Sequence, residues 1–440
     1  MTAPDMDVSA FSEEEKRELL RKLLEKKLAT KPGPAKPKAA RVIPSLQEAP
    51  EYQEFMARKA SMQDVDVEKV YFNVVDGISN DRAIIDGREF INYSGYNYVG
   101  MSGDPAVIEA TQKAVAHYGT SVSASRIGSG EKPVHRQLEA ELADFIGTED
   151  CVVFVGGYTT NESIIGHLMG PKDLILYDSY IHDSIQRGAQ LSGATVRPFP
   201  HNRWQAIDRI LEDQREQYEK VLIVIEGIYS MDGDMPDLPR FIEVKKRHQA
   251  ILMVDEAHSL GVVGETGRGV GEYFDVDRND VDLWMGTLSK TFGSCGGFIA
   301  AASEIVWYLK FTTPGFVYSV GLTPADTTAA LASLRLLVKE PERTRRLQER
   351  AALFLRLAKE QGFDTGNSKN SAVIPLILGS SMRAMKMHHK LFEAGIFALP
   401  IIFPVVPENA ARLRFFINCT HTEEQIIETM DKIKIAYREI

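Results

Sequence analysis

The chain has 440 residues, of which 44% are hydrophobic and 25% are charged, so disorder, collagen and coiled coil are excluded as descriptions of the whole molecule. Its net charge of −10 argues against a general nucleic-acid or membrane-surface binder, because such proteins need clustered lysine and arginine. The three cysteines are too few and too scattered for a disulfide framework or a zinc site. No apolar run approaches the roughly 18 residues that span a bilayer, and no apolar signal segment begins the chain. We therefore expect a cytoplasmic protein without a metal, a nucleic-acid partner or a transmembrane segment.

The first 41 residues differ from the rest in charge, with ten Lys and Arg against seven Asp and Glu. Ser12 and Glu15 form a capping-box pattern, and leucines between positions 19 and 28 form an apolar stripe, so the pattern predicts a helix. The run KPGPAKPK at 31–38 cannot continue a helix and is typical of a stiff linker. Two interpretations stay open for residues 1–45: a tethered helix that docks on another protein, or a solvated extension.

Short β-rich runs alternate with helical patterns from about residue 90 to residue 325. Several of these runs are apolar nearly throughout, as in strands that are buried on both faces of a parallel sheet. The alternation predicts a doubly wound α/β domain. The predicted strands are 151–155, 174–177, 221–225, 251–255, 283–287 and 298–301, and the predicted helices are 134–145, 204–218 and 238–248.

Longer helical patterns dominate beyond about residue 325. They predict helices over 324–338, 342–361 and 383–394, with short strands over 373–378 and 412–417. We expect a smaller α+β domain over 326–440 that closes on a large domain over 96–325, preceded by an N-terminal arm over 46–95.

Lys290 carries the strongest chemical signal in the sequence. It lies in the run GTLSKTFGSCGG at 286–297, just after a predicted buried strand. A lysine desolvated at such a position has a lowered pKa and can form a Schiff base with an aldehyde. The neighbouring glycines let the backbone approach a ligand closely. In isolation, the same motif is more often a glycine-rich turn with a surface lysine.

Asp255 and His258 follow another predicted buried strand, in the run ILMVDEAHS at 251–259. Residues at the carboxyl ends of parallel strands face the ligand crevice. There an aspartate can pair with a cationic ring nitrogen, and a histidine three positions on can hydrogen-bond a ring substituent. The DEAH tetrapeptide also occurs in helicase motors, but these need a G-x-x-x-x-G-K-[ST] phosphate loop that no stretch of this chain matches. The helicase interpretation is therefore rejected.

Three weaker signals lie at the end of a predicted strand or along one. Gly157 and Tyr158 open a predicted helix whose N-terminus could bind a phosphate, although many strand–helix turns contain glycine. His182 follows a predicted strand, but alone it is more often a structural loop histidine. Arg412 and Arg414 alternate along a strand, where a guanidinium could hold a carboxylate or merely form part of an exposed ladder.

Together these motifs resemble the α-oxoamine synthases, which are pyridoxal-phosphate (PLP) enzymes of the fold-type-I aspartate aminotransferase superfamily. The resemblance covers about residues 50–440. It implies a mainly parallel seven-stranded sheet, a smaller C-terminal α+β domain, and a homodimer with active sites at the subunit interface. The matching motifs, in the family's order, are NYSGYNYVG at 92–100, GTSVSASR at 119–126, SG at 129–130 and His135, EGIYSMDGD at 226–234, Asp255 and His258, Thr287 and Lys290, and RLR at 412–414 with His421.

The resemblance also implies a role for each matching residue. Lys290 would form the Schiff base with the cofactor and move the proton at the substrate Cα, while Asp255 would keep the pyridine nitrogen protonated. His258 would contact the phenolic oxygen of the ring, and His182 would stack on the ring face. The other implied contacts are Gly157, Tyr158 and Thr287 with the phosphate and ring, Ser230 beside the cofactor, Arg414 with the amino-acid carboxylate, and Asn97 and Ser123 on the acyl-donor side.

One position departs from the family pattern. The family usually has Thr or Ser where this chain has Val320, in the run VYSVGLTP at 317–324, and the partner subunit uses that hydroxyl to contact the phosphate. Because valine cannot donate a hydrogen bond, we expect this contact to move to Ser319 or to water.

The implied activity is a decarboxylative condensation of a small amino acid (Gly, Ala or Ser) with an acyl thioester, which gives an α-aminoketone, CO₂ and a free thiol. Some runs are similar to serine palmitoyltransferase and others to polyketide-associated 8-amino-7-oxononanoate synthase-like modules. The expected donor is therefore a long or polyketide acyl chain, either on CoA or on an acyl carrier protein that docks on residues 1–40. Two alternatives stay open: another fold-type-I enzyme, such as an aminotransferase or aldolase, and an inactive regulatory subunit.

Overall fold

The computed structural model describes Glu14 and residues 45–61 and 70–440, and the chain divides into two compact units, Met1–Val67 and Glu68–Ile440. In the first unit, a short 3-10 helix η1 (Leu46–Glu48) precedes helix α2 (Pro50–Ser61). Apart from Glu14, which is helical and exposed, the helix predicted from the capping box at Ser12 and the linker predicted over 31–38 lie outside the described residues.

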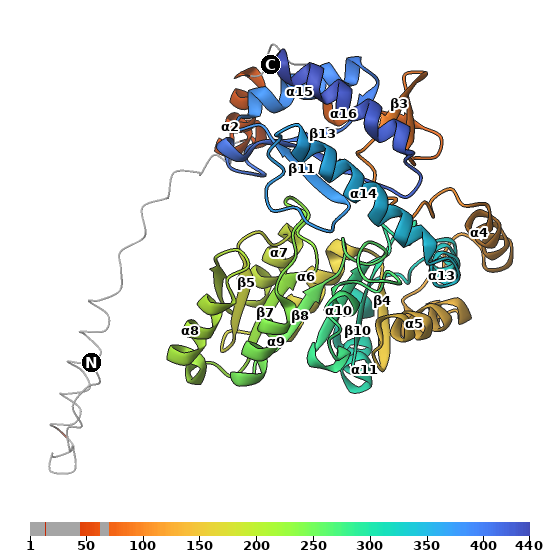
Figure 1. Cartoon of the computed structure of the whole chain (residues 1–440). Coiled ribbons are helices and arrows are strands. Elements are labelled where there is room, and N and C mark those ends of the chain that lie inside the picture. The colour runs from red at the N-terminus through yellow and green to blue at the C-terminus, as the bar shows by residue number, and fades with distance from the viewer. Residues whose placement is uncertain (1–13, 15–44, 62–69) are drawn as a thin grey trace. The chain divides into compact units, whose positions relative to one another are not determined.

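A seven-stranded sheet forms the centre of the second unit (Figure 1). The strand order is β4-β10-β9-β8-β7-β5-β6, and β10 runs antiparallel to both of its neighbours while the other pairs are parallel. The prediction of a mainly parallel seven-stranded sheet is confirmed. The strands are β4 (Asp150–Phe154), β5 (Leu174–Asp178), β6 (Thr195–Phe199), β7 (Val221–Glu226), β8 (Ile251–Asp255), β9 (Leu283–Thr287) and β10 (Gly297–Ala301).

Helices pack on this sheet through apolar side chains. A buried core joins the sheet to α6 (Gly157–Leu168), α7 (Asp183–Ser192), α11 (Ser303–Thr312) and α12 (Pro314–Val317). Helix α5 (Pro133–Ile146) packs against β4 and β10, α9 (Leu238–Arg247) packs against β8, and α8 (Trp204–Gln214) packs against α9. The other elements of this region are α4 (Pro105–Tyr118), a π-helical turn η2 (Arg126–Gly130), η3 (Arg215–Gln217), α10 (Val270–Tyr273) and η4 (Arg278–Asp280).

Burial explains which strands the sequence predicted. All six residues of β7 and all five of β9 are buried, so these strands are continuous apolar runs. Strand β6 was not predicted. It lies at the edge of the sheet, is only half-buried over most of its length, and contains Arg197 and Pro198, which an edge strand tolerates.

Two smaller sheets complete the second unit. The first has the order β1-β2-β3-β12, and the second has the order β11-β14-β13. The boundaries 46–95, 96–325 and 326–440 stay predictions. The elements are β1 (Val75–Asp76), β2 (Arg82–Ile85), β3 (Arg88–Asn92), α13 (Pro324–Lys339), α14 (Glu342–Glu360), β11 (Val373–Ile377), α15 (Ser381–Glu393), β12 (Ile396–Phe397), β13 (Leu399–Ile401), η5 (Glu408–Ala410), β14 (Arg412–Phe416) and α16 (Glu423–Arg438).

Within the described ranges, no helix is both long and apolar enough to cross a membrane. No group of three or more His, Cys, Asp or Glu side chains in these ranges is placed to hold a metal ion.

Candidate active site

A cavity of about 200 Å³ lies where the carboxyl ends of five strands of the seven-stranded sheet converge. Six strands of the sheet share one direction, so the loops that follow β4, β5, β7, β8 and β9 meet at one edge. Seven of the predicted site residues line this cavity together. The lining consists of Gly157, Tyr158, Asn161, His182, Ser184, Glu226, Asp255, Ala257, His258, Met285, Thr287, Ser289 and Lys290.

The carboxylate of Asp255 is held in place by two donors. Its Oδ2 accepts a hydrogen bond from Asn161 Nδ2 at 2.8 Å, and its Oδ1 accepts one from the backbone N–H of Ala257 at 2.9 Å. Asn161 Nδ2 also donates to Ser184 Oγ at 3.0 Å, whereas the buried Asn161 Oδ1 has no protein partner. The carboxylate is therefore fixed in orientation at the wall of the cavity, and a polar atom beside it is left for a ligand.

The amine of Lys290 lies among these strand ends rather than on the surface. Burial lowers the pKa of Lys290, an effect that the carboxylates of Asp255 and Glu226 partly oppose by favouring the ammonium form. Lys290 Nζ also lies 5.8 Å from the centre of the Tyr96 ring. A lysine in this setting is poised to exchange a proton more readily than a solvated one, as the sequence predicted.

His182 caps helix α7 and is fixed by three contacts. Its Nδ1 lies 2.8 Å from Ser184 Oγ and accepts a longer bond from the backbone N–H of Ser184, at 3.3 Å. Its own backbone N–H donates to Glu226 Oε1 at 2.6 Å. Burial lowers the pKa of His182, and the Lys290 ammonium adds to this while Asp255 opposes it. These contacts fix His182 at the start of α7 beside the cavity, and its role in the site stays a prediction.

His258 is buried beside the same cavity. Burial lowers the pKa of His258 well below its ordinary value, and the charges of Lys290 and Arg414 add to this effect. The ring Nδ1 lies 2.7 Å from Tyr98 Oη, and the Tyr98 side chain is itself fully buried. The imidazole is therefore neutral at physiological pH and held in one orientation, with the opposite ring nitrogen directed away from Tyr98.

The N-terminus of helix α6 meets the end of strand β9 at Gly157. A Cβ at this position would lie 2.6 Å from Thr287 Oγ1, so no larger residue fits without displacing the threonine. Thr287 Oγ1 lies 2.8 Å from Ser289 Oγ, and the ring of Tyr158 lies 6.2 Å from that of His182. The free N–H groups of a first helical turn and two hydroxyls are thus gathered at one end of the cavity, which suits an anion such as phosphate.

Arg414 and Ser230 lie next to the cavity but are not part of its wall. Arg414 Nη1 donates to the backbone carbonyl of Ser230 at 2.9 Å, and its guanidinium packs 4.5 Å from the centre of the Phe416 ring. Arg414 Nε is buried and has no protein partner. Arg412 is buried and donates to Asp232 at 2.8 Å. The two arginines are therefore no exposed surface ladder, and Arg414 keeps a donor available.

Asn97 and Ser123 lie away from the cavity wall. The amide of Asn97 is used within the N-terminal arm, where it donates to Ser79 and Asn80 and accepts from the backbone N–H of Ser102 at 3.1 Å. Ser123 is exposed and has a φ of 53°, and its N–H donates to Ser121 Oγ. Their predicted contacts with the acyl donor stay predictions. Val320 is 50% exposed, and the expectation that Ser319 or water replaces it as the phosphate contact stays a prediction.

Sequence reasoning missed several residues of this site. Glu226 had a signal, because it is a carboxylate that ends an otherwise apolar strand. Burial, and then the neighbouring Asp255 carboxylate, raise the pKa of Glu226 well above its ordinary value. Asn161, Ser184 and Tyr98 carried no signal that separates them from ordinary helix or loop residues.

His201 is a further residue that sequence reasoning missed, and it contacts two of the loops that carry site residues. Its Nδ1 lies 2.9 Å from Asp178 Oδ1 and its Nε2 lies 2.8 Å from Asp234 Oδ2. The two hydrogen-bonded carboxylates raise the pKa of His201 to about 10 against the opposing effect of burial. Asp178 precedes the loop of His182, and Asp234 ends the loop of Ser230. His201 therefore ties the two loops together.

Comparison with known proteins shows which enzymes this chain is similar to in sequence. The family model described as aminotransferase class I and II matches residues 88–433. Among curated relatives, the 8-amino-7-oxononanoate synthase of Geobacter sulfurreducens is 40% identical over 355 residues, which is 80% of this chain and 90% of the relative. The serine palmitoyltransferase of Bacteroides thetaiotaomicron is 36% identical over 368 residues, which is 84% of this chain and 93% of the relative.

The fold is similar to that of solved serine palmitoyltransferase structures. The serine palmitoyltransferase of Sphingomonas wittichii superposes with a TM-score of 0.84 at 31% identity, and the match covers 90% of this chain and 99% of that one. A serine palmitoyltransferase variant solved with PLP superposes with a TM-score of 0.85 at 30% identity, with the same coverage.

Proposed function

This chain belongs to the α-oxoamine synthase family of the class I and II aminotransferase superfamily, and we propose that the strand-end cavity is where it carries out that family's reaction. The reaction is the PLP-dependent decarboxylative condensation of an amino acid with an acyl thioester. Our proposal concerns the residues that perform it in this chain. The observation that carries it is that Lys290 and Asp255 line one cavity.

The residues of the cavity fit PLP on their own chemistry. The cradle at Gly157 admits no Cβ, the start of helix α6 and the hydroxyls of Thr287 and Ser289 suit a phosphate, and Lys290 offers an amine. Asp255 offers a carboxylate, and the orphaned Asn161 Oδ1 lies beside it. We assign phosphate contacts to Gly157, Tyr158 and Thr287, and the contact with the ring nitrogen to Asp255.

When bound, PLP supplies an aldehyde that captures an amine and an electron-withdrawing ring that stabilises negative charge at the substrate Cα. The role of Asp255 is to keep the ring nitrogen protonated, since an ionised carboxylate close to that nitrogen favours its cationic form. Asn161 and the Ala257 N–H hold the carboxylate so that it cannot rotate away.

Lys290 acts as the base and acid at the substrate Cα. Because burial lowers the pKa of Lys290, its amine is neutral in a larger fraction of molecules than a solvated lysine and can accept a proton. The same amine, once protonated, returns the proton after CO₂ has left. The carboxylates of Asp255 and Glu226 keep the ammonium form accessible for that return.

The two histidines orient the ligands without carrying charge. His258 is neutral and fixed by Tyr98, so it is suited to contact the phenolic oxygen of the ring. His182 is fixed by Ser184 and Glu226, so it is suited to pack on the ring face. Arg414 binds the amino-acid carboxylate, which the buried Nε without a protein partner supports. Ser230 lies beside the cofactor, and Asn97 and Ser123 lie on the acyl-donor side.

The assembly is proposed to be a homodimer with the site at the subunit interface. In the single chain, Tyr158 is 44% exposed and His182 is also exposed, so one side of the cavity is open to solvent. A partner subunit that covers this side would exclude water from the reacting groups. The three domain boundaries and the cytoplasmic location stay predictions.

A substrate screen tests the assigned activity. The PLP-loaded enzyme should show an absorbance band near roughly 420 nm that Lys290→Ala lacks, because this band reports a lysine Schiff base. Glycine, alanine and serine are then offered with acyl-CoA thioesters of increasing length, and thiol and CO₂ are measured. Formation of a keto acid without thiol release would identify an aminotransferase reaction instead. A missing 420 nm band would favour an inactive regulatory subunit.

Docking of an acyl carrier protein through residues 1–40 is the second proposal. Matched acyl-CoA and acyl-carrier-protein donors are compared with the full chain and with a chain that lacks residues 1–40. The truncation should raise KM for the carrier-protein donor alone. Equal kinetics for all four combinations would refute docking.

A further inference from the structure

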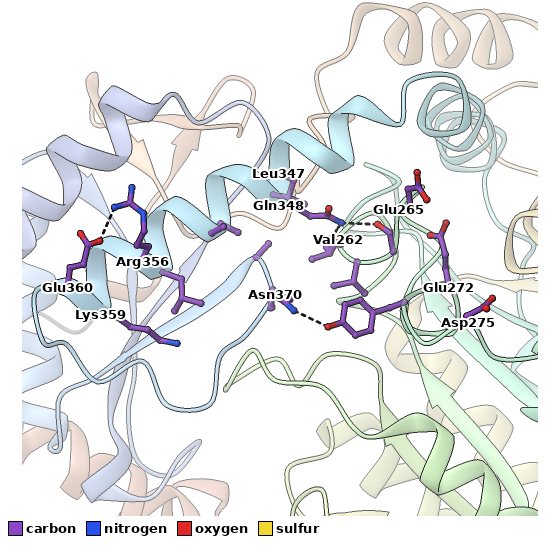
Figure 2. Close-up of a pocket in the computed structure, with 18 residues that line it drawn as sticks. Val262, Glu265, Glu272, Asp275, Leu347, Gln348, Arg356, Lys359, Glu360 and Asn370 are labelled. Atoms are coloured by element: carbon purple, nitrogen blue, oxygen red, sulfur yellow. Dashed lines mark hydrogen bonds and ion pairs between the residues drawn. The ribbon is translucent and has the colours of Figure 1, made fainter.

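A second and larger cavity, of about 990 Å³, lies between helix α14 and two other segments of the chain (Figure 2). Its walls are residues 262–265 and 272–275, the face of α14 from Leu347 to Glu360, and residues 370–372. None of its lining residues also lines the catalytic cavity. Its volume is at the upper end of the range for small-molecule sites.

The wall of this cavity, called the α14 cavity below, is only partly open apolar surface. Leu347, Ala351 and Leu355 repeat every four residues along α14, with Val262 and Val263 on the opposite wall. Leu347, Ala351 and the two valines are at most 4% exposed, so the open apolar surface on α14 comes from the exposed Ala352 and the half-buried Leu355. The α14 wall extends over about 20 Å of helix, given a rise of about 1.5 Å per residue. A short apolar chain could lie over Ala352 and Leu355.

Charge is divided between the two ends of the cavity, as Figure 2 shows. Glu265, Glu272 and Asp275 lie at one end, on the segment that follows strand β8. Arg356, Lys359 and Glu360 lie at the other end, on α14, where Arg356 Nη1 donates to Glu360 Oε1 at 2.9 Å. Carboxylates outnumber cations in the lining, so a polyanion such as a nucleotide or CoA is disfavoured.

The acidic end has groups that can receive a cation. Glu272 is already used, because it accepts hydrogen bonds from Thr266 and from the backbone N–H of Arg268. The side chains of Glu265 and Asp275 are exposed and make no hydrogen bond or ion pair within the described part of the chain, although the Arg278 guanidinium interacts electrostatically with Asp275. The ring of Tyr273 lines the same end, and aromatic rings attract ammonium groups.

We propose that the α14 cavity binds an amphipathic amine, with its apolar chain along α14 and its cationic head between Glu265, Asp275 and Tyr273. The natural ligand, which alone rests on the proposed function, would be a long-chain α-aminoketone, the class of product that the enzyme releases. Such a product has a protonated amine at one end and an acyl chain at the other.

Binding here would reach the catalytic site through a short segment. Thr344 Oγ1 donates to the carbonyl of Gly261 at 3.2 Å, and Gln348 Nε2 donates to the carbonyls of Val262 and Gly264 at 3.0 and 2.9 Å. This segment begins three residues after His258. Asn370 Nδ2 closes another wall by donating to Tyr273 Oη at 2.9 Å. A ligand held between α14 and this segment would therefore restrain the position of His258, and inhibition would be non-competitive with the amino acid.

The test uses decyltrimethylammonium, because a quaternary amine cannot condense with the cofactor aldehyde. Calorimetric titration of the PLP-loaded enzyme should give one site per chain, with roughly tenfold weaker binding for each two carbons removed from the chain. Decanoate should bind at least tenfold more weakly. Ala352→Trp should abolish binding, since Ala352 lines the cavity from an exposed position, whereas Glu349→Trp, exposed on α14 outside the lining, should not.

A second experiment tests the two carboxylates. The double variant Glu265→Gln, Asp275→Asn should weaken binding of decyltrimethylammonium about tenfold, whereas the control Glu304→Gln, at an exposed position outside the cavity, should leave it unchanged. Unchanged affinity in Ala352→Trp, or equal affinity for decanoate, would overturn the proposal. A change of oligomeric mass in Ala352→Trp would also overturn it, because the face would then be an interface between copies. Calorimetry measures binding without turnover. A failure of the proposed catalytic activity, which is tested by thiol and CO₂ release, would therefore not be mistaken for a failure of binding in this cavity.

Discussion

The two cavities of this molecule use charge in opposite ways. In the catalytic cavity the ionisable groups are packed into about 200 Å³ at the strand ends, and Asp255, Glu226 and His182 each have hydrogen-bonded partners. In the α14 cavity, of about 990 Å³, Glu265 and Asp275 are exposed at one end, and most of the apolar stripe of α14 is buried. Burial changes the pKa values of Glu226 and His182, because a low-dielectric site penalises charge and strengthens the effect of neighbouring charges. The buried ionisable groups of the first cavity suit proton transfer. The exposed carboxylates of the second suit the binding of a cationic ligand.

The largest effect is expected at Lys290. Lys290→Ala removes both the Schiff-base amine and the base at Cα, so kcat for thiol release should fall by about 10⁴-fold or more. Steady-state kinetics with saturating PLP measures this. Lys339→Ala, at an exposed position near the end of α13, is the matched control and should change kcat by less than twofold. Comparable losses in the two variants would contradict the role of Lys290.

A smaller loss is expected at Asp255. Asp255→Asn keeps the shape but removes the charge that holds the ring nitrogen protonated, so kcat should fall by about 10²-fold to 10³-fold with little change in KM. The 420 nm band should persist, because Lys290 is intact. Loss of the band together with the activity would mean instead that Asp255 is needed to hold the cofactor.

Arg414→Lys tests recognition of the amino acid. Lysine keeps the positive charge but cannot form two parallel hydrogen bonds to a carboxylate, so KM for the amino acid should rise about tenfold while kcat changes less. KM for the acyl thioester is measured in parallel and should stay constant. An equal rise in both KM values would indicate a general distortion of strand β14 rather than a lost carboxylate contact.

The smallest effect is expected behind the catalytic cavity, at His201. Asp178 and Asp234 raise the pKa of His201 to about 10, and Tyr180 and Tyr229 also face the ring. A raised folded-state pKa means that the stabilisation is complete below the unfolded value near 6.5 and is lost as pH rises through 10. His201→Gln should therefore lower Tm by about 3 °C at pH 6, and the difference should shrink above pH 10. A deficit in Tm that does not vary with pH would refute the charged clamp.

The sequence determined the strands and the residues at their ends. Strands β8 and β9 were predicted with their observed bounds, because both are almost entirely buried and are apolar up to their last residues, Asp255 and Thr287. Asp255, Thr287 and Lys290 stand at or just after these strands, and parallel strands bring their carboxyl ends together. The same rule placed Gly157 and His182 in the site.

Tertiary structure alone decided which groups support them. Asn161 reaches Asp255 from helix α6, and Tyr98 reaches His258 from 160 positions away, and neither pairing leaves a periodic pattern in the sequence. The α14 cavity also leaves no signal in the sequence, since Leu347, Ala351 and Leu355 form an ordinary apolar stripe of a helix. Local patterns record whether a residue is buried, but not which distant residue it meets, because that depends on how the helices pack on the sheet.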